Sequence, residues 1–301
     1  MRKALILFIL LINTLITNAQ TDSLMREMNK GTQGDDAVIA TFKSGRLILS
    51  QTTTMVKKYN LDFKVGHRFG DIGGTDGGSK ILWGLDNSSD IYIDFNYGIS
   101  DRLNIGFGRS KYEQLLDLQL KYALLQQTAN DHSPFSVSLL AKTAFTPYKV
   151  VTNVFDNYGN RFSYLGQAIV SRKFSTNFSM QLSPTILMRN VVLNPGDEET
   201  MFALGAAARL KLSKRFGIIA DYYKVFSEYR RETTSDNFYD PLGLGFEIET
   251  GGHVFTLTFV NAEAIVENNF LPNSTSSWGK GEYRFGFTIS RMFSFKKSIE
   301  E

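Results

Sequence analysis

Three histidines are the side chains best suited to act as bases or metal ligands near neutral pH, and they lie far apart in the sequence, at His67, His132 and His253. The 301 residues contain no cysteine. This excludes thiolate catalysis, a cysteine-ligated zinc or iron–sulfur site, a disulfide framework and lipidation of an N-terminal cysteine. No sequence motif places a Ser or Asp nucleophile beside a base, so we expect no catalytic residues and no enzyme.

A glycine-rich stretch from Gly73 to Gly78 could cradle a phosphate or bind calcium. A phosphate loop needs a Lys followed by Ser or Thr at fixed spacing and a helix N-terminus, and neither is evident. Calcium could be held by Asp71, Asp76 and Asp86, but an external loop is the simpler interpretation. We therefore expect no cofactor and no metal.

The composition favours strands. Aromatic residues make up 13% of the chain, with 24 Phe and 13 Tyr against 6 Pro, and such side chains fit a pleated surface. The formal net charge is only +3, from 33 basic and 30 acidic residues. A nearly balanced charge gives no reason to expect a nucleic acid partner.

The first residues have the parts of a secretory signal peptide. Arg2 and Lys3 precede an apolar run from Ala4 to Ile16, and Ala19 is a small residue suited to cleavage. Residues 1–19 are therefore predicted to be removed, leaving Gln20 first. An uncleaved anchor is the alternative, but the run is short for a bilayer core of about 30 Å. No later stretch is long and apolar enough for a membrane helix, so a spanning mature chain must form a closed barrel.

From about residue 59, apolar and polar side chains alternate in segments of about ten residues, which is the two-residue period of a strand with one apolar face. In residues 91–97, for example, Ile93 and Phe95 fall on one face and Asp94 on the other. The predicted strands are 59–69, 89–98, 102–110, 114–125, 134–145, 161–172, 177–189, 200–212, 215–226, 240–249, 253–261 and 281–295.

The connections between these strands alternate in length. Short links follow the even-numbered strands, with one of middling length at Gln126–Ser133, and long links follow the odd-numbered strands except at the short link Lys111–Glu113. Outer-membrane barrels alternate short periplasmic turns and long external loops in this way. The predicted fold is all-β, a transmembrane antiparallel up-and-down barrel of about twelve strands in residues 59–301, located in the cell outer membrane. A soluble exported β-domain is the alternative, but strands near ten residues are longer than the usual five or six.

Residues 20–58 are predicted to be an N-terminal extension, periplasmic or lumenal. Residues 21–45 are polar without a clear period, which suggests a mobile segment. Residues 46–56 resemble a further strand, but counting it would make the strand number odd. We therefore expect residues 46–56 in the lumen or at the periplasmic rim.

The polar faces carry charges of both signs, as expected of a hydrated barrel interior. The residues predicted to face the lumen are Asp94, Arg102, Asp117, Lys121, Arg209, Asp221, Glu247 and Arg284. In this topology His67 lies near the external end, on the face of Phe63 and Val65, about a barrel height from His132 and His253. A site that uses all three histidines is not expected, and a girdle role suits His67 better than catalysis.

Several strings resemble a Bacteroidetes family of membrane-bound β-barrel proteins, classified as a domain of unknown function. They are His67–Asp71, Gly84–Asp86, Tyr97–Leu103, Gly108–Ser110, Lys121–Tyr122 and Glu249–Phe255. Their order and spacing carry the resemblance, which extends from about residue 42. It implies a barrel fold and a Gram-negative outer-membrane location, and it implies no activity, substrate or catalytic residue.

Three functions are open on the sequence. A passive channel or small-solute transporter is the leading hypothesis, because charged side chains line the predicted lumen. A structural barrel whose loops or N-terminal extension bind another envelope protein is the second, and an outer-membrane enzyme is the third. Outer-membrane lipid is the partner common to all three.

Overall fold

The computed structural model describes residues 38–147, 156–233, 237–250 and 252–295. The predicted signal peptide, residues 1–19, lies outside the described residues. Twelve strands form one closed antiparallel barrel, which confirms the predicted fold and strand number. The strands are β1 Asn60–Asp71, β2 Ser88–Gly98, β3 Leu103–Ser110, β4 Leu116–Leu125, β5 Ser136–Phe145, β6 Phe162–Lys173, β7 Phe178–Arg189, β8 Thr200–Lys211, β9 Phe216–Phe226, β10 Leu242–Thr250, β11 His253–Val260 and β12 Arg284–Ser294.

Each strand pairs with its neighbours in sequence, and β12 closes the ring against β1. The closing register sets Asn60 opposite Ser294 and Gly66 opposite Thr288. Closure satisfies every strand edge, which a backbone in lipid requires. The predicted bounds differ from the observed ones by a few residues; the last strand begins at Arg284 rather than at residue 281.

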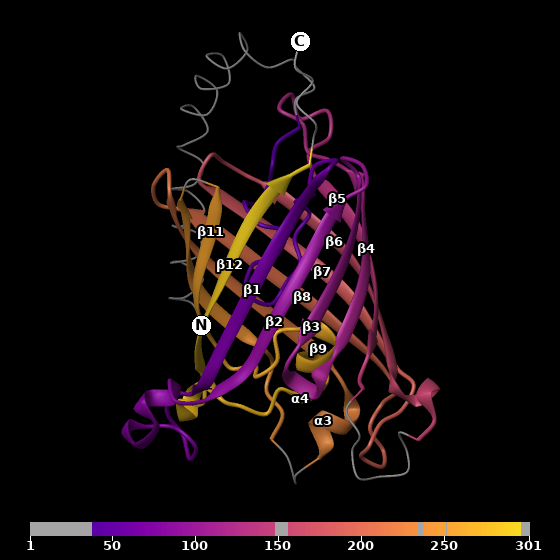
Figure 1. The fold of residues 1–301 in the computed structure, drawn as a ribbon, viewed down its shortest axis with the longest axis vertical. Coiled ribbons are helices and arrows are strands. Elements are labelled where there is room, and N and C mark those ends of the chain that lie inside the picture. The colour runs from indigo at the N-terminus through magenta and orange to yellow at the C-terminus, as the bar shows by residue number, and fades with distance from the viewer. Residues whose placement is uncertain (1–37, 148–155, 234–236, 251, 296–301) are drawn as a thin grey trace, which may run out of the picture.

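The two ends of the barrel differ in their connections (Figure 1). The links after even-numbered strands are short except for that between β4 and β5. The links after odd-numbered strands, long except for that between β3 and β4, gather at the other end with the helices. The helices are η1 Ser79–Gly84, η2 Tyr112–Gln114, η4 Tyr158–Arg161, α3 Glu228–Glu232, α4 Glu267–Asn273 and η5 Trp278–Lys280. By the usual asymmetry of such barrels, the short-turn end is periplasmic and the long-loop end external.

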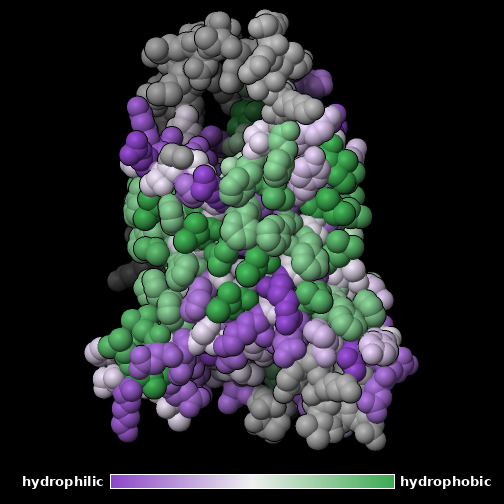
Figure 2. All heavy atoms as spheres, in the orientation of Figure 1, coloured by the Kyte–Doolittle hydropathy of each residue, from purple (hydrophilic) through white to green (hydrophobic). Residues whose placement is uncertain are grey.

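The outer face of the wall is apolar. Side chains such as Phe107, Leu120 and Leu139 are exposed on the outside, and each alternates with an inward-facing neighbour in its strand. Figure 2 shows hydrophobic residues gathered in a band across the middle of one face, with hydrophilic residues toward the long-loop end. An apolar band around a closed sheet is the surface that a bilayer covers.

The barrel interior is filled by two segments that are not part of the sheet. One is residues 38–58, here called the plug, which joins β1 from the short-turn end. The other is residues 261–283, here called the insert, which connects β11 to β12 and contains α4. Buried apolar side chains of both, including Phe42, Leu49 and Phe270, form one cluster with wall residues. A ring of twelve strands is too wide for wall side chains alone to fill.

The plug has little regular structure. Its backbone makes only isolated bridges, such as Arg46 to Gln51 and Lys58 to Gly98. Thr41, Phe42, Ser44 and Gly45, which lie in the segment predicted to be mobile, are buried inside the barrel. Their burial comes from contacts with the wall, which a local pattern does not reveal. No helix among the described residues has the length and apolar character needed to cross a membrane.

Candidate functional site

The turn at the tip of the plug is bound by one wall carboxylate. Asp221 of β9 accepts hydrogen bonds from the backbone N–H groups of Leu49 and Ser50 at 2.9 and 2.7 Å, and more weakly from Ile48 at 3.3 Å. The Ser50 hydroxyl donates to the other carboxylate oxygen at 2.6 Å. Successive N–H groups in a turn form a concave anion site, and Asp221 occupies it. The turn and the wall are therefore matched to each other.

Wall side chains from other strands bind the plug backbone. Asn104 of β3 bonds to both the N–H and the carbonyl of Val56, each at 2.8 Å. Lys121 of β4 donates to the carbonyl oxygens of Thr52 and Thr54 at 3.1 and 2.8 Å. Further contacts are Gln181 to the Gln51 carbonyl, the Thr53 hydroxyl with that of Ser171, and Arg68 to the Ile48 carbonyl. The wall thus replaces the backbone partners that a strand would supply.

Two wall glycines allow this close approach. A Cβ at Gly98 would lie 2.2 Å from the carbonyl oxygen of Lys57, and one at Gly243 would lie 2.6 Å from a methyl carbon of Ile48. Both distances are too short for a real contact. Any larger residue at these two positions would displace the plug.

The plug and the insert meet in a buried ionic cluster. Arg46 of the plug lies 2.9 Å from both carboxylate oxygens of Glu267, at the start of α4, and donates to the Ile265 carbonyl at 2.8 Å. Lys142 of β5 lies 2.7 Å from the same carboxylate and 4.0 Å from Asp117. All four charged side chains are buried, so removal of one partner leaves an uncompensated charge.

The ionisation of Glu267 follows from these neighbours. Burial raises the pKa of the Glu267 carboxyl, but the positive charges of Arg46 and Lys142 outweigh burial and lower that pKa to about 2. Glu267 is therefore a carboxylate at neutral pH. It joins three separate parts of the chain, namely the plug, the insert and the wall.

The insert is bound by arginines of the strands beside it. Arg284 of β12 donates to the Asn261 carbonyl at 2.8 Å and pairs with Glu263 at 2.7 Å and Asp71 at 2.9 Å. Arg68 of β1 donates to the carbonyls of Ala262 and Ala264. These bonds direct the insert into the lumen instead of away from the mouth.

The structure places the predicted lumen residues as follows. Asp94, Asp117, Lys121, Arg209, Asp221, Glu247 and Arg284 are buried. Arg209 and Glu247 pair with each other at 2.7 Å, and Asp94 lies 3.7 Å from Lys64. Arg102 is different: it lies exposed in the turn between β2 and β3, so its predicted lumen position is wrong. The strand begins one residue later, at Leu103, and the turn directs Arg102 to solvent.

The pairing of Arg46 with Glu267 is not predicted from the sequence. Arg46 belongs to residues 46–56, which are expected in the lumen or at the periplasmic rim, but Glu267 lies in a link between predicted strands. The one available signal is the run Glu267-Asn268-Asn269 followed by Phe270 and Leu271, which mixes polar and apolar residues as a buried helix in a polar lumen would.

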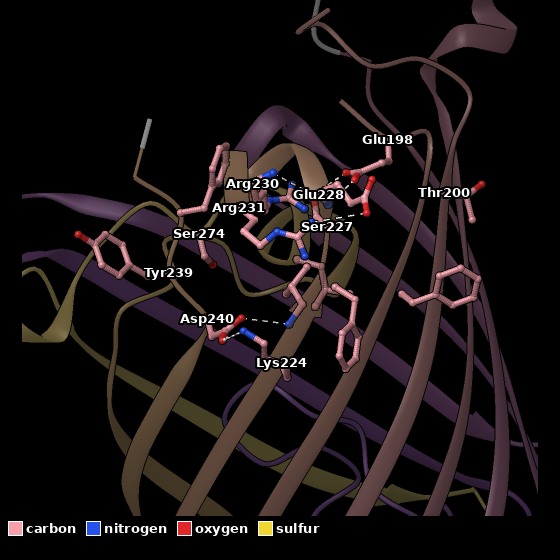
Figure 3. A pocket seen from close by; sticks show the side chains of 15 residues that line it. Glu198, Thr200, Lys224, Ser227, Glu228, Arg230, Arg231, Tyr239, Asp240 and Ser274 are labelled. Carbon is pink, nitrogen blue, oxygen red and sulfur yellow. Dashed lines mark hydrogen bonds and ion pairs between the residues drawn. The ribbon is translucent and has the colours of Figure 1, made fainter. Parts of the chain in front are cut away.

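Two cavities lie at the external end. The larger, of about 570 Å³, is drawn in Figure 3. Its lining combines outward-facing side chains of β8 and β9, such as Phe202, with α3 and with Leu271 of α4, so it lies in the rim where the wall meets the loops. Asp240 there accepts from Lys224 and from the Tyr222 hydroxyl, each at 2.8 Å. The smaller cavity, of about 260 Å³, lies against the polar side of α4.

The histidines do not form a site. His67 of β1 stacks on Phe287 at a ring distance of 5.6 Å, and His253 is the first residue of β11, stacked on Phe255 at 5.9 Å. Within the described residues, no group of three or more His, Asp or Glu is placed to hold a metal ion. Asp71, one of the three conceivable calcium ligands, pairs with Arg284.

A closed antiparallel barrel with an even strand number and an apolar outer band defines an integral protein of the outer-membrane type. Residues 42–293 match the family described as the membrane bound beta barrel domain, DUF5777. The chain belongs to this family, and it is an outer-membrane β-barrel protein. No curated protein sequence matches it significantly.

Solved barrels share the general architecture at low identity. The NanC porin is 8% identical, with a TM-score of 0.47, over 79% of this chain and 100% of that chain. The KdgM porin is 6% identical, with a TM-score of 0.44, over 79% and 99%. An outer-membrane channel from Pseudomonas putida F1 is 10% identical, with a TM-score of 0.42, over 79% and 97%. Likeness at this level carries no conclusion about activity.

Proposed function

We propose that the protein is an outer-membrane channel for small polar solutes, and that the plug closes it. The observation that carries the proposal is the plug itself. It is a segment attached to the sheet at one end, and polar side chains from at least six wall strands bind it. When the plug leaves, these side chains face water and line a hydrated passage.

The chemistry of the contacts supports reversible closure. Most wall bonds to the plug join a side chain to a backbone group, and both partners can exchange the bond for one to water. The plug also packs Phe42, Leu47 and Leu49 into the apolar cluster of the lumen, and opening exposes that part of its surface to water. The polar wall groups that bound the plug backbone then line a hydrated passage.

The absence of cysteine from the chain makes a clean test possible. The hydroxyl oxygens of Thr53 in the plug and Ser171 in β6 are 2.5 Å apart, close to the separation of about 2 Å in a disulfide. The double variant Thr53→Cys and Ser171→Cys should fasten the plug to the wall when oxidised. Planar-bilayer recordings should then show current in the reduced state and none in the oxidised state.

The controls are the two single-cysteine variants, whose currents should not depend on the oxidation state. Equal currents in the oxidised and reduced double variant would mean that the plug does not close the passage. No current in any state would remove the channel proposal. The alternative would then be a structural or partner-binding barrel, which cross-linking and co-purification from membranes would test.

We also infer that residues 1–19 are a signal peptide cleaved after Ala19. The basic start, the apolar run and the small residue at the cut support this, and export is what an outer-membrane location requires. N-terminal sequencing of the protein from membranes should begin at Gln20. A sequence that begins at Met1 would exclude cleavage.

A further inference from the structure

The smaller cavity lies beside α4 at the long-loop end of the barrel. Its volume is about 260 Å³. The lining comes from η2, the residue after β5, η4, the start of β6, the end of β7, the loop after β7 and α4. Pockets for drug-sized ligands are usually about 300–1,000 Å³, so this cavity suits a molecule the size of a monosaccharide.

Two buried polar atoms of the lining lack partners within the described part of the chain. Asn268 of α4 is 3% exposed, and its amide nitrogen donates to the Ser163 hydroxyl at 2.8 Å. Its amide oxygen has no hydrogen-bond partner among the described residues, and neither has Nε of Arg189. Buried polar groups in native proteins are nearly always paired, and an exception needs an explanation. One unpaired acceptor and one unpaired donor on residues that line the same cavity match a ligand that can both donate and accept.

The charge of the lining is balanced. Arg161 and Arg189 contribute two positive charges, and Glu113 and Asp197 contribute two negative charges. Arg189 and Asp197 also pair directly, at 3.1 Å. A balanced site gives no net attraction to an anion or a cation, so the ligand it suits is neutral.

We propose that this cavity is a recognition site for a small neutral sugar at the external mouth. Each sugar hydroxyl both donates and accepts a hydrogen bond, which is the pair of functions that Asn268 and Arg189 leave open. The side-chain amides of Asn194, Asn269 and Asn273 also line the cavity and offer both functions. This inference rests on the proposed channel, because it names the class of solute that the channel admits.

The position of the site in the insert means that a solute binds there before it passes through the channel. Asn268 directly follows Glu267, whose carboxylate pairs with Arg46 of the plug. A sugar bound at Asn268 therefore lies one residue along α4 from the carboxylate that holds the plug. Solute selection would then take place before the plug is reached.

Saturation-transfer NMR on the full-length mature protein in detergent micelles tests the site without requiring conduction. The probes are glucose, which is neutral, glucuronate, which is an anion, and glucosamine, which is a cation. We expect saturable binding of glucose and weaker binding of both charged sugars. The variant Asn268→Leu, of similar size without an amide, should weaken glucose binding about tenfold, equivalent to about 1.4 kcal/mol.

The matched control is Asn177→Leu, in the exposed turn between β6 and β7 at the opposite end of the barrel, which should bind glucose like the parent protein. If Asn268→Leu does not fold, Asn273→Ala at the end of α4 replaces it and should also weaken binding.

Absence of saturable glucose binding, or glucose binding unchanged in the cavity variants, would overturn the site. Tighter binding of glucuronate than of glucose would overturn the neutral ligand. Glucose binding without ionic current would contradict the proposed channel but not the sugar site. Ionic current without glucose binding would contradict the sugar site but not the channel.

Discussion

The plug and the insert fill the same lumen but are attached to the wall differently. The insert begins after Val260 and ends before Arg284, so both of its ends are fixed by adjacent paired strands. The plug is continuous with β1 only at its C-terminal end. At its other end, Val38 makes a single bridge to Thr128 near a periplasmic turn. Only non-covalent bonds keep the plug in the lumen, so it is the segment that can leave without opening the barrel.

The contacts of the two segments differ in kind as well. The insert contains a helix whose Phe270 packs edge-on against Tyr223 of β9 at a ring distance of 5.4 Å. The plug contributes Phe42, Leu47 and Leu49 to the same apolar cluster, but its backbone is also bound by polar wall side chains, with Asp221 at its tip. The difference shows how one barrel can contain a permanent constriction and a removable closure. Each of the following changes should loosen the plug more than the insert, because the chain holds the insert at both ends.

The largest effect is expected for Glu267→Gln. The substitution leaves Arg46 and Lys142 buried without a counter-charge, and breaking a buried pair in this way costs about 3–5 kcal/mol. Trypsin should then cleave after Arg46 much faster, whereas cleavage after Lys280 in the insert should not change. The matched control is Glu228→Gln, whose side chain is 84% exposed. Equal acceleration at both sites would show that the two segments are released together.

Asp221→Ala should come next. It removes the acceptor for three backbone N–H groups and the Ser50 hydroxyl, and charge-assisted bonds of this kind contribute about 2–4 kcal/mol together. Hydrogen exchange at Leu49 and Ser50 should accelerate, and exchange at Phe270 should stay slow. Asp240→Ala, at the external rim, serves as the control. Unchanged exchange at Ser50 would mean that Asp221 does not hold the tip.

Acid should release the plug through Glu267. The pKa of this carboxyl in the folded protein, about 2, lies below its ordinary value of 4.5. The stabilisation is therefore complete above about pH 4.5 and is lost as the pH falls toward 2. Channel current should be constant from pH 7 to about pH 5 and rise below that. The rise should be absent in Glu267→Gln; if it persists there, another group is responsible.

The smallest effect is expected for Asn104→Ala. This change removes two neutral hydrogen bonds to Val56, each worth about 1 kcal/mol. Hydrogen exchange at the Val56 amide should accelerate, and the tip at Leu49 should remain protected because Asp221 still binds it. Asn177→Ala in the distant turn provides the control. Exchange that accelerates equally at Val56 and Leu49 would show that the plug is released as one unit.

The wall of the barrel was predictable because its signal is local. Alternation such as Ile93, Asp94 and Phe95 assigns the two faces of a strand from neighbouring residues alone. The short turns after even-numbered strands then order the strands around the ring. Arg102 was misplaced because a strand end is uncertain by a residue, and one residue decides between lumen and turn.

The sequence by itself determined that the barrel wall has one apolar and one polar face. Side chains alternate between the two faces of a strand with a period of two residues, which depends only on backbone geometry. The tertiary structure alone decided which side chains meet in the interior. Arg46, Glu267 and Lys142 are separated by more than 90 residues from one another, and nothing local announces that they share one buried cluster. Closure of the ring brings them together, because it encloses a space that wall side chains cannot fill. The polar wall groups that face this space need partners, which the rest of the chain supplies.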